Sequence, residues 1–252
     1  MQGFAPQTVR EMIEILTGIF EGGTYCTLAD SVADTQGGLS YGKHQASEKQ
    51  GSLVQMLKMY AGRTEPPVPD PDFLSQLETH LQLYDATGSS YKGTAAQRTA
   101  YKALLKTICK DPAMQKAQDD FFDQFYFVPA MQHASDYGVA SPLAQSIFYD
   151  ISIQAGVRRE SFYRAGLAQW IAEHKKSTCT ACQPKDATGP DEITFLRYVN
   201  AARRKEMLAP TSSKAYKASV YRPNEYDKLL DAKNLDFKQD FVFHNVPIKA
   251  LP

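Results

Sequence analysis

The sequence predicts a mainly α-helical protein (α+β class) with a small β element near the N-terminus. Three observations support this class. Apolar residues recur mostly at the three- and four-residue spacing of amphipathic helices. Segments that contain proline and glycine separate these stretches from one another. Residues 24–45 are instead rich in Gly, Thr and Ser, and they surround a short strand pattern at Leu39–Gly42.

The first helix is predicted over residues 7–20, where apolar side chains share one face. Its apolar stripe comprises Val9, Met12, Ile13, Leu16, Ile19 and Phe20. Gly22 and Gly23 follow, and glycine just past a C-terminus typically ends a helix. Further helices are predicted over residues 47–60, 72–84, 95–108, 142–155, 159–174, 190–208 and 223–231. One more begins at Asp111-Pro112, because proline suits a first turn, and Pro129 predicts a kink or break in it.

Length and charge exclude several classes of protein. A chain of 252 residues fits one domain over residues 1–252 with two lobes, or a C-terminal fragment of a larger protein. Lys and Arg number 28 and Asp and Glu number 28, so nothing in the total charge indicates binding to nucleic acid. We expect no membrane insertion, because no apolar run approaches 18 residues. The N-terminus also lacks the pattern of a signal peptide.

The four cysteines do not form the framework of a disulfide-rich protein. Cys26 and Cys109 stand alone in the sequence, whereas Cys179 and Cys182 form a C-x-x-C pair, which is half of a zinc site. His174 supplies a third ligand type nearby, but the sequence offers no clear fourth. We therefore expect a dithiol or a small disulfide at this pair, and neither a metal nor another cofactor.

Glu21 and Asp34 are the candidate pair of reacting carboxyl groups. Glu21 ends the first apolar stripe, and Asp34 lies in a glycine-rich stretch. A carboxyl group among apolar neighbours tends to stay protonated, and one in a wetter loop stays ionised. Such a pair suits the cleavage of a glycosidic bond, where one group protonates the leaving oxygen and the other activates water. On spacing alone, the simpler interpretation is a surface charge at a helix end and a turn residue.

Several segments in this order resemble the family 46 chitosanases, members of the lysozyme-like superfamily. The first is Glu21, then Asp34, before Gly38-Leu39-Ser40-Tyr41-Gly42. The others are Ala117–Asp120, Tyr126–Ala130, Phe148–Asp150, Asp191–Leu196, Ala202–Arg204 and Lys233–Phe237. The resemblance covers nearly the whole chain. It implies a two-lobed fold with a small β element and a cleft between the lobes.

The resemblance also implies roles for individual residues. Glu21 is the general acid, Asp34 is the general base, and the hydroxyl of Ser40 helps to hold the attacking water. The family works by inversion, which places the two carboxyl groups roughly 6.5–9.5 Å apart. Tyr25, Tyr41, Lys43, His44 and Gln45 flank the acid pair and are candidates to bind sugar units. For His44, a hydrogen-bonding role within the loop is an equal alternative.

Asp150 and Arg203 are predicted to form an ion pair. Asp150 follows Ile147 and Leu143 along an apolar face, and Arg203 lies on the face of Leu196 and Val199. Buried charges are costly unless they are paired, so the two side chains should meet. By resemblance, the pair lies near the catalytic acid and Arg222 extends it. A salt bridge with only a structural role is an equal alternative.

Residues 38–47 depart from the chitosanases and look more like the muramidase domains of type VI secretion effectors. Ser40 stands where the chitosanases have threonine, and Gln36 or Gly37 stands where they have arginine. Lys43 and the basic segment 203–222 favour an anionic glycan such as peptidoglycan. We therefore expect an antibacterial muramidase that acts on peptidoglycan. The alternatives are a chitosanase and a glycan-binding module without catalysis.

By the same resemblance, we expect an exported protein. A secretion system would deliver it to the periplasm of a target cell, and a cognate immunity protein would block its cleft.

Overall fold

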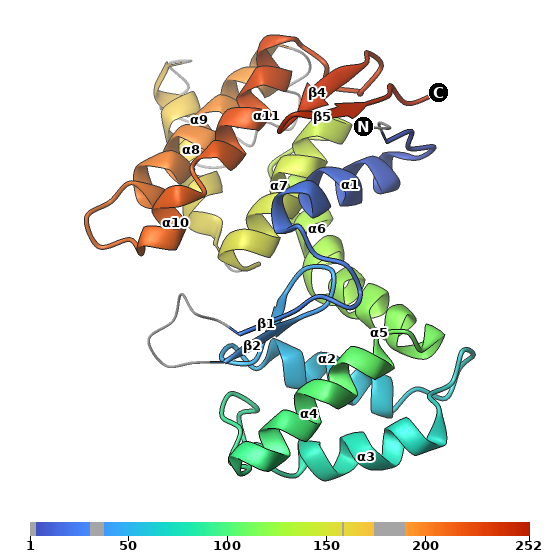
Figure 1. Cartoon of the computed structure of the whole chain (residues 1–252). Helices are drawn as coiled ribbons and strands as arrows, with labels where there is room; N and C mark the ends of the chain where they lie inside the picture. Colours follow the sequence, from blue (N-terminus) through green and yellow to red (C-terminus); the bar gives the residue numbers. More distant parts are fainter. Residues whose placement is uncertain (1–3, 31–37, 158, 174–189) are drawn as a thin grey trace. The chain divides into compact units, whose positions relative to one another are not determined.

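The computed structural model describes residues 4–30, 38–157, 159–173 and 190–252. Most described residues are helical (Figure 1). The helices are α1 (Val9–Glu21), α2 (Ser52–Ala61), α3 (Pro71–Leu81), α4 (Ala95–Ile108), α5 (Pro112–Phe122), the π-helical turn η1 (Asp123–Phe127), α6 (Val128–Asp136), α7 (Pro142–Ala155), α8 (Glu160–Glu173), α9 (Pro190–Met207), α10 (Lys214–Ala218) and α11 (Tyr221–Asp231). The strands are β1 (Leu28–Asp30), β2 (Leu39–Tyr41), β3 (Ala46–Ser47), β4 (Phe241–Phe243) and β5 (Val246–Ile248). The predicted fold class is therefore confirmed.

The chain divides into two compact units, which are described separately. The catalytic-loop unit is Glu21–Gln124, and the helical unit joins Met1–Phe20 with Phe125–Pro252. The catalytic-loop unit is thus inserted into the sequence of the helical unit. Among the described residues, no helix is both long and apolar enough to cross a membrane.

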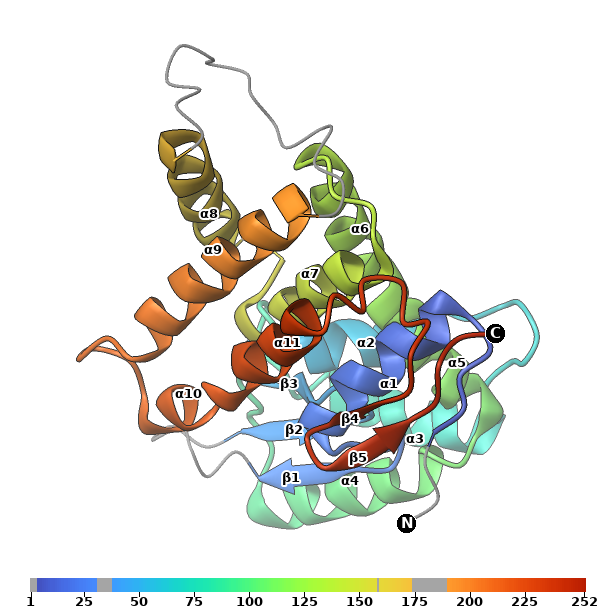
Figure 2. The same cartoon turned by 90° about the horizontal axis from the view of Figure 1, so that it is seen from above.

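The catalytic-loop unit contains an antiparallel sheet in the order β1-β2-β3, and β1 and β2 run side by side in both views (Figures 1 and 2). Helices α2, α4 and α5 supply much of its core. The predicted stripe of α2 is confirmed, since Leu53, Met56, Leu57 and Tyr60 are all buried. Helix α2 begins at Ser52 rather than at residue 47, because residues 46–47 pair with β2 and Gly51 has a left-handed backbone.

A disulfide joins Cys26, in the loop after α1, to Cys109, at the C-terminal end of α4. From the sequence, neither cysteine has an assigned partner, so this disulfide was not predicted. Two single cysteines separated by 83 residues carry no spacing signal, and only the fold brings them together. Cys179, Cys182 and His174 lie outside the described residues.

The helical unit is built around one apolar cluster. Helices α1, α6, α7, α8, α9 and α11 contribute to it, together with Phe243 and Ile248 of the C-terminal hairpin. That hairpin, β4–β5, was not predicted. A two-residue turn at His244-Asn245 joins its strands, with φ of 48° and 66°, as a type I′ turn requires. The N-terminal segment pairs with the same hairpin, since Phe4 N donates to Pro247 O at 3.1 Å.

The predicted break near Pro129 is observed as a change of helix type. Helix α5 ends at Phe122, the π-helical turn covers Asp123–Phe127, and α6 begins at Val128. Pro129 therefore lies in the first turn of α6, where its missing N–H group costs no hydrogen bond. The short helix α10 was also not predicted, since five residues are too few for a periodic pattern.

We predict that Cys26→Ser lowers the free energy of unfolding of the catalytic-loop unit by about 2–4 kcal/mol, because the disulfide restrains a long loop in the unfolded chain. Denaturant unfolding followed by amide exchange of residues 38–124 measures this loss. The variant with serine at both positions is the control and should lose about as much as the single variant. Unchanged stability of Cys26→Ser would contradict the stabilising role of the disulfide.

Candidate active site

Glu21 is the last residue of α1 and is half-buried. Gly22 follows with a φ of 62°, a left-handed conformation that ends the helix at low cost. At Gly23, an added Cβ atom would lie 2.5 Å from the Lys43 carbonyl oxygen. The loop that follows Glu21 therefore packs directly on the loop that follows β2, and only glycine permits this approach.

Ser40 lies at the centre of the small sheet. It is the middle residue of β2 and pairs with Ala29 of β1 and Ser47 of β3. Its neighbours Leu39 and Tyr41 are buried, whereas Ser40 is only half-buried. Because side chains alternate along a strand, Ser40 points to the face opposite Leu39 and Tyr41. Asp34 lies outside the described residues, so its distance from Glu21 stays a prediction.

Tyr25 and Lys43 are joined through a third residue, Asp119 of α5. The Tyr25 hydroxyl donates to Asp119 at 3.0 Å, and Lys43 Nζ lies 2.5 Å from Asp119 Oδ1. Lys43 Nζ also lies 5.6 Å from the centroid of the Tyr25 ring. The charge of Lys43 is thus balanced within the protein. Whether Tyr25 and Lys43 bind sugar units stays a prediction.

Tyr41 and His44 are not surface residues, which corrects their assignment to substrate binding. Tyr41 is fully buried, and its hydroxyl donates to Leu105 O at 2.9 Å. Its alternation with buried Leu39 is the sequence signal that predicts this burial. His44 is also buried, and its ring contacts the Phe122 ring edge-on, with 4.8 Å between the two ring centroids. Gln45 is half-buried, and its Nε2 donates to the Gly42 carbonyl oxygen at 3.0 Å.

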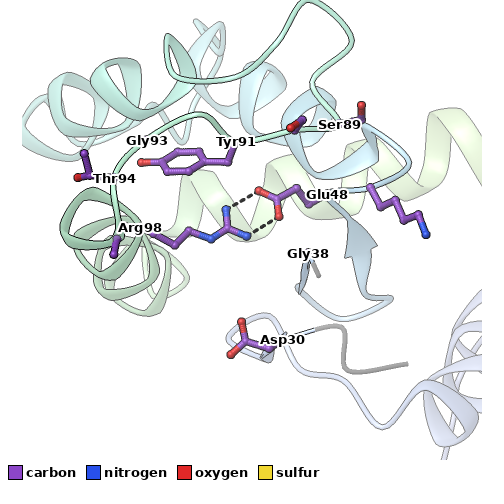
Figure 3. Close-up of a pocket in the computed structure, with 11 residues that line it drawn as sticks. Asp30, Gly38, Glu48, Ser89, Tyr91, Gly93, Thr94 and Arg98 are labelled. Carbon is purple, nitrogen blue, oxygen red and sulfur yellow. Dashed lines mark hydrogen bonds and ion pairs between the residues drawn. The ribbon is translucent and has the colours of Figure 1, made fainter. Parts of the chain in front are cut away.

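A polar pocket of about 750 Å³ opens in the catalytic-loop unit (Figure 3). Asp30, the last residue of β1, and Gly38, next to β2, form one side, and Ser89, Tyr91 and Thr94 line the other. The ion pair between Glu48 and Arg98 crosses its wall, and Figure 3 shows the two dashed contacts between these side chains. The pocket therefore lies at the strand ends between which Asp34 falls in the sequence.

Four hydrogen bonds hold Glu48 in this wall, and its ion pair with Arg98 carries no net charge. Glu48 Oε1 accepts from Arg98 Nη1 and from the Tyr84 hydroxyl, each at 2.5 Å. Glu48 Oε2 accepts from Arg98 Nη2 at 2.5 Å and from Leu39 N at 2.9 Å. Burial disfavours the ionised carboxylate, but the hydrogen bonds from Arg98 and Tyr84 outweigh it and hold the pKa of Glu48 below its usual value. Neither partner has a periodic sequence pattern, so sequence reasoning missed this pair.

In the helical unit, the predicted pair Asp150–Arg203 is confirmed. Arg203 Nη2 donates to Asp150 Oδ2 at 2.6 Å, and Arg222 Nη2 donates to Asp150 Oδ1 at 2.5 Å. Asp150 is fully buried, yet the guanidinium groups of Arg222 and Arg203 outweigh this burial and hold its pKa below the usual value. Arg203 also donates through Nε to Gln154 Oε1 at 3.0 Å.

Arg222 connects this cluster to the end of α1. Its guanidinium carbon lies 4.9 Å from the centroid of the Phe20 ring, and Phe20 directly precedes Glu21 in the chain. An influence of the cluster on the proposed acid Glu21 stays a prediction. Among the described residues, no three His, Cys, Asp or Glu side chains form a group that could hold a metal ion.

Comparison with known proteins gives one family. The model of glycosyl hydrolase family 46 matches residues 27–241, a stretch that contains Asp34 and Ser40 and begins after Glu21. A chitosanase of Bacillus subtilis (strain 168) is 28% identical over 203 residues, which are 79% of this chain and 67% of that protein. A chitosanase of Nocardioides sp. (strain N106) is 29% identical over 142 residues, which are 56% of this chain and 46% of that protein.

Solved structures show the same fold. The complex of a family 46 chitosanase of Gynuella sunshinyii with chitotetraose superposes with a TM-score of 0.70 at 20% identity, covering 95% of this chain and 96% of that one. A mutant chitosanase of Bacillus subtilis MY002, in complex with six glucosamine units, gives a TM-score of 0.72 at 19% identity, covering 96% of both chains.

These findings correct the expected substrate. The relatives are chitosanases, so the prediction of a peptidoglycan muramidase is wrong, and the alternative of a chitosanase agrees better. The suggested likeness to type VI secretion effectors has no support in these comparisons. The charge count also included cations that the fold uses internally. Lys43 pairs with Asp119, Arg203 and Arg222 pair with buried Asp150, and Arg204 pairs with Asp227, so these cations do not form a free basic surface.

We predict that Asp150→Ala and Arg203→Ala each lower the free energy of unfolding by about 3–5 kcal/mol, because the first leaves two buried guanidinium groups without their carboxylate and the second removes one of the two cations that balance a fully buried carboxylate. Thermal or denaturant unfolding of both single variants and the double variant measures the loss. The double variant should lose less than the sum, since the two groups interact. Arg197→Ala is the matched control on the same helix. Its partner Asp231 is exposed, and the change should cost at most about 1 kcal/mol. Strictly additive losses would contradict the pairing.

Proposed function

Because the chain belongs to glycosyl hydrolase family 46, we propose that this glycoside hydrolase is a chitosanase that cleaves the β-1,4 bonds of chitosan. The family match over residues 27–241 carries this proposal. Both curated relatives are chitosanases, and the structures that share the fold include complexes with chitotetraose and with glucosamine units.

The proposed mechanism is an inverting hydrolysis with two carboxyl groups. Glu21 donates its proton to the leaving glycosidic oxygen, while Asp34 accepts a proton from the attacking water. The water attacks the anomeric carbon from the opposite face, so the bond to the leaving group breaks as the bond to water forms. Ser40 accepts or donates a hydrogen bond to that water. The place of Ser40 at the centre of a three-stranded sheet, with a rigid backbone, suits this positioning role.

The substrate is tested by incubating the protein with chitosan and, in parallel, with purified peptidoglycan sacculi. Mass spectrometry should identify glucosamine oligomers from chitosan, and proton NMR of the first products should show the inverted anomer. Release of muropeptides with no attack on chitosan would overturn the proposal. Absence of products from both would indicate a protein without this catalysis.

We also propose that the protein works in an oxidising compartment outside the cytoplasm. The disulfide Cys26–Cys109 supports this, because structural disulfides form and persist mainly in such compartments. The expected secretion system and immunity protein remain predictions, tested by capture of partners from the producing cell.

We predict that Glu21→Gln and Asp34→Asn each abolish turnover of chitosan oligomers, by at least about 10²-fold, while thermal melting stays unchanged. A glutamine has no proton to give at the working pH, and an asparagine cannot accept one from water. Asp30→Asn is the comparison variant, since Asp30 is the neighbouring carboxylate, pairs with Lys102 at 2.5 Å and transfers no proton in the proposed mechanism. If Asp30→Asn is inactive and Asp34→Asn is active, the assignment of Asp34 as the general base is wrong.

We predict that Ser40→Ala slows turnover by roughly 10–10³-fold, because one hydrogen bond to the water is lost while both carboxyl groups remain. Ser40→Thr is the matched control. It keeps the hydroxyl and restores the residue type of the related chitosanases, so it should retain most activity. Initial rates on a defined glucosamine oligomer measure both. A wild-type rate in Ser40→Ala would leave Ser40 as a strand residue only.

A further inference from the structure

Gln118 of α5 is a fully buried amide that holds two separate loops. Its Oε1 accepts from the backbone N–H of Lys43 at 3.1 Å, and its Nε2 donates to the carbonyl oxygen of Tyr25 at 2.9 Å. The Tyr25 loop begins just after Glu21, and the Lys43 loop begins just after β2, which carries Ser40. One side chain therefore joins the segment that bears the proposed acid to the segment that bears the proposed water-binding serine.

The surrounding backbone is shaped around this amide. Gly42 has a φ of 83°, and a Cβ atom added there would overlap Gln118 Oε1. The two loops also bond directly, since Gly42 N donates to Thr27 O at 2.9 Å. The backbones of the two loops thus lie close together, and the amide of Gln118 bonds to both of them at this place.

Gln118 differs from the other links between α5 and these loops. Asp119 also joins Tyr25 and Lys43, but its side chain is 37% exposed, so water and salt weaken that contact. Gln118 itself is fully buried, and its loss would remove one hydrogen bond each from the N–H of Lys43 and the C=O of Tyr25 at a partly buried position. An amide offers one donor and one acceptor without a charge, which is the combination that the two backbone groups require.

We propose that Gln118 is a positioning residue for catalysis, which fixes the spacing between the Glu21 and Ser40 segments. The inference rests on the proposed function, in which these two residues act on one glycosidic bond. A small misplacement of reacting groups is enough to slow an enzyme by about 10²-fold. Gln118 itself touches neither substrate nor reacting atoms, so its effect should fall on kcat rather than on KM.

The first test compares Gln118→Met with Gln115→Met. Methionine keeps the length and shape of the side chain but neither hydrogen bond. We expect kcat on a glucosamine oligomer to fall by about 10²-fold, KM to change less than about threefold, and exchange of the Lys43 amide to accelerate. Gln115 is the matched control one turn earlier on α5, because its Nε2 bonds to Cys109 O at 3.2 Å and not to either loop. Gln115→Met should keep both kcat and the exchange rate of Lys43.

The second test is Gln118→Glu, which separates positioning from packing through pH. An ionised glutamate repels the carbonyl oxygen of Tyr25, whereas a protonated one donates to it and accepts from the N–H of Lys43. The activity of Gln118→Glu relative to wild type should therefore rise as the pH falls. A side chain that only fills space would give a constant ratio of activities at all pH values.

The outcomes distinguish the two proposals. If wild type does not cleave chitosan, the proposed function fails, and exchange of the Lys43 amide still decides whether Gln118 holds the loops. An unchanged Lys43 exchange rate or an unchanged kcat in folded Gln118→Met overturns the positioning role, as does a ratio for Gln118→Glu that does not vary with pH. If Gln118→Met does not fold, the pH dependence of Gln118→Glu decides.

Discussion

The buried carboxylate of Asp150 is the constraint around which the helical unit is organised. It sits with no exposed surface between two guanidinium groups, and these come from α9 and α11 while Asp150 comes from α7. Removing such a charge from water is costly, so it persists only where partners approach from fixed directions. Three helices must therefore keep their register at one point. The apolar cluster of the same unit stabilises the helices, and this ion cluster joins α7 to α9 and α11 at one position along each helix.

The catalytic-loop unit is built differently, because the segments around its proposed catalytic residues are loops and short strands rather than long helices. Helix α5 holds these segments through the buried amide of Gln118, the carboxylate of Asp119 and apolar side chains. The wall of the neighbouring pocket has its charges balanced internally by Glu48 and Arg98. In both units, several cations that look available in the sequence, such as Lys43 and Arg203, are paired within the fold. Counting basic residues along a segment therefore says little about the charge that a glycan meets.

The sequence predicted helices and side-chain pairs well where a single periodic pattern of apolar residues determines them. Helices α4 and α7 begin and end as expected, since Thr94 and Ser141 cap their first turns and their apolar faces are continuous. The Asp150–Arg203 pair could be predicted because both charged residues lie on apolar faces of their helices. The Cys26–Cys109 disulfide and the Glu48–Arg98 pair did not, because each joins single residues that lie far apart in the chain. Short elements such as β3 and α10 depend on tertiary contacts more than on local preference.

The nesting of one unit within the other has a consequence for synthesis on the ribosome. Helix α1 is synthesised before residues 21–124, yet its buried residues Met12, Ile13 and Leu16 belong to the same cluster as Phe243 and Ile248, which are synthesised after them. Residues 21–124 have their partners within their own stretch and can fold while the rest is still being made. The apolar face of α1 must therefore wait for residues beyond Gln124 before its cluster can form. A circular permutant that places α1 after β5 would remove this delay, because the N-terminal segment already pairs with that hairpin.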